Sequence, residues 1–177
     1  MEKLYHTEID TPIGVMQCCA SDKGLYLLEF HDRPNLNETI RKLATQLNKQ
    51  VVQAENEIAN KLRKELQLYF KGELQFFTTP TIFTGTDFQE EVWHALLKVP
   101  YGKTRTYKEQ TDILGNPKAI RAVASANGKN KIAIVVPCHR IIGSDGSLTG
   151  YAGGLNRKRY LLSLEHSIAG PKDLFST

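Results

Sequence analysis

Residues 77–85, with the sequence FTTPTIFTG, divide the chain into two parts with different sequence patterns. This segment is rich in Thr and contains Pro80 and Gly85, which favour turns and loops over regular structure. Short apolar runs typical of strands precede it, and short helical patterns follow it. We therefore predict two small domains at residues 1–78 and 87–168, joined by a linker at 79–86 and followed by a tail at 169–177.

The first part has the pattern of a small α/β domain. Apolar runs at residues 4–7, 13–19 and 25–30 predict three strands separated by turn residues. Apolar side chains that recur every three or four residues predict helices at 36–47 and 58–70. The adjacent Cys18 and Cys19 fit neither a disulfide framework nor a zinc-binding spacing, so we expect them to be buried and expect no metal.

The second part has the pattern of short helices joined by tight turns. We predict helices at 88–98, 107–114 and 117–127, each preceded by a residue that caps helix N-termini: Asp87, Thr106 and Asn116. Gly115 and Asn116 form a turn between the second and third of these helices that is short enough for a helix-turn-helix. A last helix is predicted at 155–165.

The third of these helices is unusual because small residues follow one of its faces. Ala119, Ala122 and Ala126 recur at helical spacing, and Arg121 lies beside them. Such a face fits a core helix that packs tightly. It also fits a helix whose backbone approaches another surface closely, and the spacing alone leaves both interpretations open.

Charge is distributed unevenly between the two parts. Residues 1–85 contain 10 Lys and Arg against 11 Asp and Glu, whereas residues 86–177 contain 13 against 8, which together give the net charge of +4. A polyanion is therefore expected to bind the second part. The first residues, MEKLYHTEID, lack the pattern of a signal peptide, and no apolar run approaches the roughly 18 residues that span a bilayer. We expect a cytoplasmic protein that does not bind membranes.

Cys138 is the candidate nucleophile of the chain. It follows an apolar run, residues 132–136, which predicts a buried strand or extended segment, and Pro137 stiffens the backbone before it. A thiol with a pKa near ~8.5 is mostly protonated at neutral pH, so it needs a base or a positive field to react. His139 and Arg140 can supply these, His139 through a bridging water because neighbouring side chains diverge. A buried structural cysteine is the alternative.

The segment VPCHRI at residues 136–141 resembles the active-site signature of the O6-alkylguanine-DNA alkyltransferases, also called methylated-DNA–protein-cysteine methyltransferases. The resemblance extends over residues 88–165 through FQEEVWHALLKVPYGKTRTY, GNPKAIRAVASANGKN, IVVPCHRIIGSDGSLTGYAGGL and LLSLE. It implies an α/β protein of two small domains. The first would be an RNase H-like α/β domain, and the second a mostly helical, winged helix-turn-helix-like catalytic domain.

The resemblance also implies a repair reaction that each molecule performs once. Cys138 would accept the alkyl group of O6-alkylguanine, and of O4-alkylthymine, as a thioether that is not reversed. His139 would deprotonate the thiol through a water, Glu165 would orient His139, and Asn130 would connect the helix-turn-helix to the active site. The partner would be double-stranded DNA with alkylated bases, bound by a monomer, and no cofactor or metal is implied.

A bound nucleotide would have to rotate out of the duplex, because its alkylated oxygen is otherwise out of reach. By resemblance, Tyr107 would press on the target phosphate and Arg121 would fill the gap in the base stack. The helix at 117–127 would lie in the minor groove through its small residues, Ala119, Ala122, Ala126 and Asn127. The flipped base would enter a pocket formed by Val136, Thr149, Tyr151 and Ala152. Tyr151 would also take part in catalysis by donating a hydrogen bond to the base and assisting its departure.

Three other functions fit parts of the pattern. An alkyltransferase-like damage sensor would keep the fold but lack the nucleophile, which Cys138 argues against. A helix-turn-helix transcription regulator would need polar, base-reading side chains on the helix at 117–127, where this chain has mostly small apolar ones. A cysteine hydrolase would turn over repeatedly. One departure from the family pattern is Lys131, which stands after Asn130 where the family often has Pro.

Overall fold

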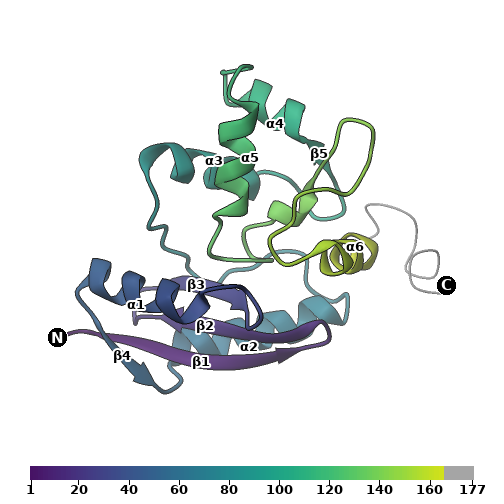
Figure 1. Ribbon diagram of the computed structural model, residues 1–177. Helices are drawn as coiled ribbons and strands as arrows, with labels where there is room; N and C mark the ends of the chain where they lie inside the picture. Colours follow the sequence, from purple (N-terminus) through teal and green to yellow (C-terminus); the bar gives the residue numbers. More distant parts are fainter. Residues whose placement is uncertain (166–177) are drawn as a thin grey trace. The chain divides into compact units, whose positions relative to one another are not determined.

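The computed structural model describes residues 1–165, which form two compact units that divide between Thr84 and Gly85 (Figure 1). The tail predicted at 169–177 lies outside these residues. Within residues 1–165, no helix is both long and apolar enough to cross a bilayer. The predicted class, a small α/β unit followed by a mostly helical one, is confirmed.

The first unit contains a four-stranded sheet with the order β3-β2-β1-β4. Strands β1 (Lys3–Thr11), β2 (Gly14–Ala20) and β3 (Leu25–Phe30) pair antiparallel in sequence order and confirm the three predicted strands. The fourth strand, β4 (Gln50–Gln53), pairs parallel with β1 and was not predicted. Its four residues, QVVQ, are too few to show a strand periodicity, so only its pairing reveals it.

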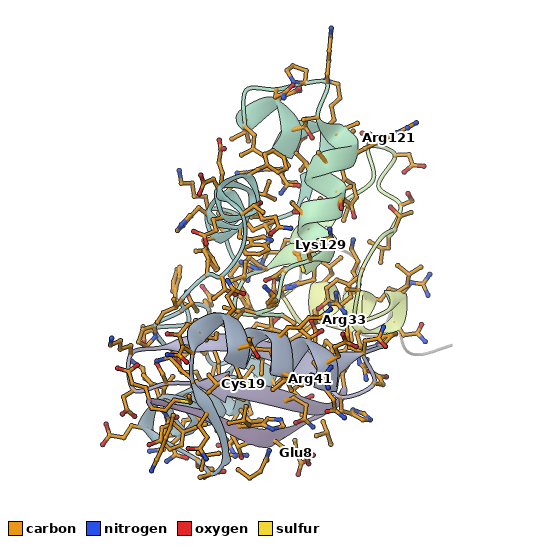
Figure 2. The ribbon with its side chains drawn as sticks, turned by 60° about the vertical axis from the view of Figure 1, so that its left-hand side comes forward. Glu8, Cys19, Arg33, Arg41, Arg121 and Lys129 are labelled. Carbon is orange, nitrogen blue, oxygen red and sulfur yellow. The ribbon has the colours of Figure 1, made fainter. Side chains whose placement is uncertain are left out.

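Two helices cover opposite faces of this sheet (Figure 1). Helix α1 (Leu36–Leu47) packs Ile40 and Leu43 into a cluster with Cys19 and other residues of the sheet, and Figure 2 shows Cys19 in this layer. Helix α2 (Glu57–Phe70) contacts β1 and β2. Side chains alternate between the two faces of a strand, so Cys18 points to the face that α2 covers. Both helices confirm the sequence prediction, which placed the start of α2 one residue later.

Part of the segment expected to be a linker packs within the first unit. The buried carboxylate of Glu65, in α2, accepts backbone N–H bonds of 2.7 Å from Thr78 and from Thr79, and both hydroxyls also donate to it. The backbone at Thr81 pairs with Leu25 of β3. Burial opposes ionisation of Glu65, but these hydrogen bonds lower the pKa of the carboxyl overall.

The second unit consists mainly of four helices, α3 (Asp87–Leu97), α4 (Tyr107–Ile113), α5 (Ile120–Gly128) and α6 (Leu155–Leu164). A short parallel pair, β5 (Arg105–Thr106) with β6 (Ile141–Ile142), brings the start of α4 beside the chain that follows Cys138. Helices α4 and α5 contact each other as the predicted helix-turn-helix (Figure 1).

Two predicted helix starts are corrected. Thr86, not Asp87, caps α3, because its hydroxyl accepts from the backbone N–H of Gln89 while Gln89 bonds back to Thr86. The same arrangement confirms Thr106 as the cap of α4. Helix α5 starts at Ile120 rather than at residue 117, since residues 116–119 form a separate turn closed by the N–H of Ala119 on the carbonyl of Asn116, at 3.0 Å.

The prediction of a strand or extended segment at residues 132–136 was wrong. These residues are buried, as their apolar side chains predict, but they form consecutive turns. Ile134 adopts a left-handed conformation with φ of 71°, and the N–H of Val136 bonds to the carbonyl of Ile132 at 3.0 Å. An apolar run indicates burial, whereas its backbone conformation here depends on side-chain bonds described below.

Candidate active site and nucleic-acid interface

Cys138 begins a short 3-10 helix, η1 (Cys138–Arg140), at the end of these turns. Its side chain is half-buried, whereas Cys18 and Cys19 are fully buried. Burial raises the pKa of the Cys18 thiol to about 12, and that of Cys19 is raised by the same cause. Of the three cysteines, Cys138 is therefore the one that an external reagent can reach in a reactive form.

Asn130 connects the turns at 132–136 to the sulfur. Its buried side-chain amide accepts a hydrogen bond from the backbone N–H of Ile132 at 2.9 Å. The Nδ2 group donates to the carbonyl of Val136 at 2.9 Å and lies 3.3 Å from Sγ of Cys138. One amide therefore stabilises the unusual turn and places a donor beside the candidate nucleophile.

His139 is completely buried and bonds to Glu165. The distance from His139 Nε2 to Glu165 Oε2 is 2.8 Å. A carboxylate can only accept, so Nε2 carries the proton and Nδ1 is left as the basic nitrogen. Among the described residues, Nδ1 is buried and has no hydrogen-bond partner. The side chain beside Cys138 therefore offers an unoccupied acceptor, which is what a proton-accepting base requires.

Arg140 binds the same carboxylate, contrary to its predicted role as a charge for Cys138. Its Nε donates to Oε1 of Glu165 at 2.7 Å, and its Nη2 donates to Oε2 at 3.0 Å. The Nη1 group donates to the carbonyl of Val99 at 2.7 Å, at the end of α3. The buried carboxylate thus compensates the guanidinium charge and orients the imidazole at the same time.

Burial and the contacts within this cluster lower the pKa values of both Glu165 and His139. Burial opposes the ionisation of Glu165, but His139 and Arg140 lower the pKa of its carboxyl overall. Burial lowers the pKa of His139, although Glu165 acts in the opposite direction. We therefore expect a neutral His139 and an ionised Glu165 at neutral pH, which is the state in which Nδ1 can accept a proton.

These shifts predict that the free energy of unfolding decreases as the pH falls below about 6.5. The pKa of His139 is lower in the folded state than its ordinary 6.5, so the unfolded chain takes up the proton first and acid favours unfolding. Glu165 acts in the same direction below 4.5. Each group contributes up to ~1.4 kcal/mol per pH unit. Urea unfolding at several pH values measures this dependence, and a free energy of unfolding that stays constant from about pH 7 to pH 5 would contradict it.

Tyr107 and Lys158 bind the loop that precedes α6. The Tyr107 hydroxyl donates to the carbonyls of Thr149, at 2.9 Å, and of Gly150, at 3.2 Å. Gly150 has φ of +65°, and a Cβ there would lie 2.8 Å from the Tyr107 oxygen, so only glycine fits. The Lys158 ammonium donates to the carbonyl of Thr149 at 2.8 Å and to that of Ile141 at 2.5 Å. Tyr107, predicted to contact DNA, thus also supports the predicted base pocket.

The remaining predicted pocket residues lie in or near this loop. Val136 is fully buried, and its carbonyl is bound by Asn130. Tyr151 is half-buried, and Thr149 and Ala152 are exposed. The residues described contain no group of three or more His, Cys, Asp or Glu that could bind a metal ion.

Helix α5 places only part of its predicted DNA-contacting residues on its exposed face. Arg121 and Ala122 are exposed, and Ala119 is half-buried. Figure 2 shows Arg121 projecting from α5, with Lys129 near the other end of the helix. Arg121 forms no hydrogen bond or ion pair with any residue in the range 1–165. It is thus available to a ligand.

Ala126 and Asn127, by contrast, face the interior of the unit, which corrects their predicted contact with DNA. The carbonyl of Ala126 accepts from Nε1 of Trp93 at 2.8 Å. Asn127 and Gln110 exchange two amide hydrogen bonds, of 2.8 and 2.7 Å, in the buried interface between α4 and α5. Ala126 and Asn127 were assigned to the DNA-contacting face from their positions along the helix. Their partners, Trp93 and Gln110, lie far away in the sequence and could not be predicted from it.

Both units of the chain match known protein families. Residues 4–83 match the model of the 6-O-methylguanine DNA methyltransferase ribonuclease-like domain, and residues 87–167 match that of the 6-O-methylguanine DNA methyltransferase DNA-binding domain. Both domain types were predicted, and together the matches cover most of the chain.

Individual relatives agree with this result. A methylated-DNA–protein-cysteine methyltransferase of Methanosarcina barkeri is 42% identical over 93% of this chain and 98% of its own length. One from Mycolicibacterium paratuberculosis is 43% identical over 91% of each chain. The crystal structure of Mycobacterium tuberculosis OGT in complex with DNA matches with a TM-score of 0.81 and 40% identity, covering 98% of this chain and 100% of that one. The chain therefore belongs to the family of methylated-DNA–protein-cysteine methyltransferases.

Proposed function

We propose that this protein removes the alkyl group from O6-alkylguanine in double-stranded DNA, and from O4-alkylthymine, by transferring it irreversibly to Cys138. The observation that carries this proposal is the arrangement around one accessible sulfur. Cys138 lies 3.3 Å from the Asn130 amide, and the neighbouring His139 is buried, bound to Glu165 and has an unoccupied Nδ1.

The reaction follows from these groups. His139 Nδ1 takes the thiol proton through a bridging water, and Glu165 stabilises the imidazolium that forms. The thiolate attacks the alkyl carbon in line, so that the S–C bond forms while the C–O6 bond breaks. The electron pair of the broken bond remains on O6 of the guanine. The guanine takes up a proton and is thereby restored within the DNA. A thioether sulfur is a poor leaving group, so each molecule reacts once.

DNA would bind along the exposed face of α5 in the minor groove, where Ala122 permits a close approach and Arg121 reaches into the base stack. The flipped base would then lie beside Tyr151 and the backbone of the loop at residues 149–152, with Tyr107 at the target phosphate. We also propose that one monomer suffices for the reaction. The DNA-bound relative supports binding to DNA by this fold.

The competing functions receive less support. A damage sensor would lack a nucleophile, whereas this chain has the half-buried Cys138 next to a buried histidine–carboxylate pair. Helix α5 exposes Ala122 and Arg121 rather than several base-reading amides, and Asn127 is buried, which disfavours a sequence-specific regulator. A hydrolase would turn over, so the stoichiometry of the reaction separates it from an alkyltransferase.

Intact-mass analysis after incubation with an excess of O6-methylguanine duplex tests the proposal. We expect every active molecule to gain one methyl group and peptide mapping to place it on Cys138. Unmodified duplex serves as the control. A protein that remains unmodified while the duplex keeps its methyl group, or that releases repeated equivalents of product, would refute the proposal.

Arg121→Ala is expected to slow the repair of duplex DNA by roughly tenfold or more, equivalent to about 1.4 kcal/mol, with little effect on reaction with free O6-methylguanine base. The reason is that Arg121 would act on base flipping and not on the thiolate. Lys108→Ala provides a matched control, because Lys108 is an exposed cation on α4 that pairs with Asp112. Equal losses on the duplex and on the free base would show that Arg121 does not act through the DNA.

A further inference from the structure

Two buried amides join α4 to α5 within the helix-turn-helix. Gln110 of α4 is 1% exposed, and Asn127 of α5 is 4% exposed. The Gln110 Nε2 group donates to Oδ1 of Asn127 at 2.8 Å, and the Asn127 Nδ2 group donates to Oε1 of Gln110 at 2.7 Å. Each amide has one acceptor oxygen and one donor nitrogen, so both bonds form only when the two groups meet edge to edge. This amide pair, Gln110 with Asn127, therefore favours one relative position of the two helices.

The amide pair contributes more to the choice of this position than to stability. Apolar side chains of the same size could fill the space, and replacing both members of a buried hydrogen-bonded pair in this way can be neutral or even stabilising. Apolar surfaces can pack at several rotations, whereas two directional hydrogen bonds form at one. A buried polar pair thus specifies an arrangement, as a single buried polar residue does in a coiled coil.

The amide pair lies at the anchored end of α5. The adjacent Ala126 carbonyl accepts from Nε1 of Trp93, in α3, so polar contacts hold this end of α5 to both α3 and α4. Arg121 lies six positions before Asn127, about 9 Å along the helix axis. Figure 2 shows it near the end of α5 opposite Lys129. A tilt of α5 by about 10° at the amide pair would move the backbone of Arg121 by about 1.6 Å.

The other helix of the pair carries Tyr107. Gln110 follows Tyr107 by three positions in α4, which is about one helical turn. The Tyr107 hydroxyl is itself held by the carbonyls of Thr149 and Gly150. The amide pair therefore connects the two residues that would contact the target nucleotide, Tyr107 at its phosphate and Arg121 in the base stack. A displacement of about 1 Å can slow an enzymatic reaction by roughly 10²-fold.

We propose that the amide pair positions Arg121 relative to Tyr107, so that both residues act on the same nucleotide during flipping. This role rests on the proposed function, in which these two residues help to rotate the alkylated nucleotide out of the duplex. Gln110 and Asn127 are buried and would not touch the DNA. They are positioning residues, which act through the two helices that carry Tyr107 and Arg121.

The double variant Gln110→Met with Asn127→Leu tests the proposal, because it removes both hydrogen bonds and keeps the size of the side chains. We expect a melting temperature equal to or above that of the wild type and an unchanged reaction with free O6-methylguanine base. Repair of O6-methylguanine duplex should slow by roughly tenfold or more, since α5 is no longer held at one position. Asn127→Leu alone leaves the Gln110 amide unpaired and should lower the melting temperature.

Two further variants separate hydrogen bonding from other effects. Gln110→Asn with Asn127→Gln, the exchange variant, keeps one amide on each helix and the same total length, so it should retain most of the duplex repair. Thr111→Val is the matched control, because the buried Thr111 hydroxyl bonds to the Tyr107 carbonyl of the same helix. The control loses a buried hydrogen bond that does not reach α5, and its ratio of duplex to free-base reaction should equal that of the wild type.

A fluorescent duplex reports flipping without requiring methyl transfer. 2-Aminopurine placed next to the target guanine becomes brighter when the base stack opens. At saturating protein we expect this signal with the wild type, its loss in Arg121→Ala and a clear decrease in the double variant. A normal wild-type signal without methyl transfer would refute the proposed reaction at Cys138 but not the role of the amide pair. Absence of the signal in the wild type would refute flipping and this role together.

Wild-type rates of duplex repair in the double variant would overturn the proposal. Equal losses on the duplex and on the free base would also overturn it, because they place the effect at the sulfur. Failure of the double variant to fold would show that the amide pair serves stability instead. An exchange variant that folds but repairs duplex as slowly as the double variant would show that the two hydrogen bonds do not set the position of α5.

Discussion

Cys138→Ala is expected to eliminate methyl transfer from O6-methylguanine DNA while the protein still folds and binds the duplex. In the proposed reaction this sulfur forms the new bond, and neither Cys18 nor Cys19 can replace it, since both thiols are buried and protonated at neutral pH. Intact-mass analysis measures the transfer, and a gel-shift or anisotropy titration measures the binding. Removing one half-buried sulfur atom should change the stability by no more than about 1 kcal/mol.

Cys18→Ala is the matched control for this variant. Cys18 is fully buried in β2, so its replacement should lower the melting temperature but leave one methyl group per folded molecule. Methyl transfer to Cys138→Ala, at any of the other residues, would show that the proposed acceptor is wrong. Loss of DNA binding in the same variant would mean that the sulfur also has a structural role.

Glu165→Gln is expected to lower the free energy of unfolding by about 3–5 kcal/mol, the usual cost of breaking a buried ion pair. The carboxylate accepts from His139 Nε2 and twice from Arg140, and all three side chains are buried. A neutral amide leaves the guanidinium charge uncompensated and directs one N–H group toward another donor. Urea denaturation at neutral pH measures the loss.

The same substitution should also slow alkyl transfer by roughly 10²–10⁴-fold, the range expected when general-base catalysis is removed. Without the carboxylate, neither the tautomer nor the protonated state of His139 is stabilised. Glu91→Gln makes the same chemical change at an exposed position of α3 and should affect neither property. A stability loss below about 1 kcal/mol would show that Glu165 does not compensate Arg140 as the distances indicate.

Features with a local signal were predictable from the sequence. Helix α1 was predicted with the observed bounds, Leu36–Leu47, because its apolar residues recur at helical spacing. Thr106 was predicted as a cap because the capping residue and its helix are adjacent in the chain. The candidate nucleophile was selected from Pro137, Cys138 and His139, which are consecutive, and it stays a prediction. In each case the residues that determine the structure lie within a few positions of one another.

Features that depend on distant partners were missed or misassigned. Asn127 was expected at the DNA because it lies on α5, but Gln110, 17 positions earlier, buries it. Arg140 was expected to assist Cys138, but Glu165, 25 positions later, binds it. Lys158 lies between Arg157 and Arg159, and three consecutive cations are typical of an exposed helical face. No neighbouring residue in the sequence indicates that Lys158 is fully buried.

The sequence by itself thus determined the two-part organisation and most of the helices, and it singled out Cys138 as the candidate nucleophile, because each of these is encoded by neighbouring residues. The tertiary structure decided which charges are paired, which amides are buried and how the segment before Cys138 turns. Electrostatic and hydrogen-bond energies depend on distance in space and on exclusion of water, and both arise only when residues far apart in the chain come together.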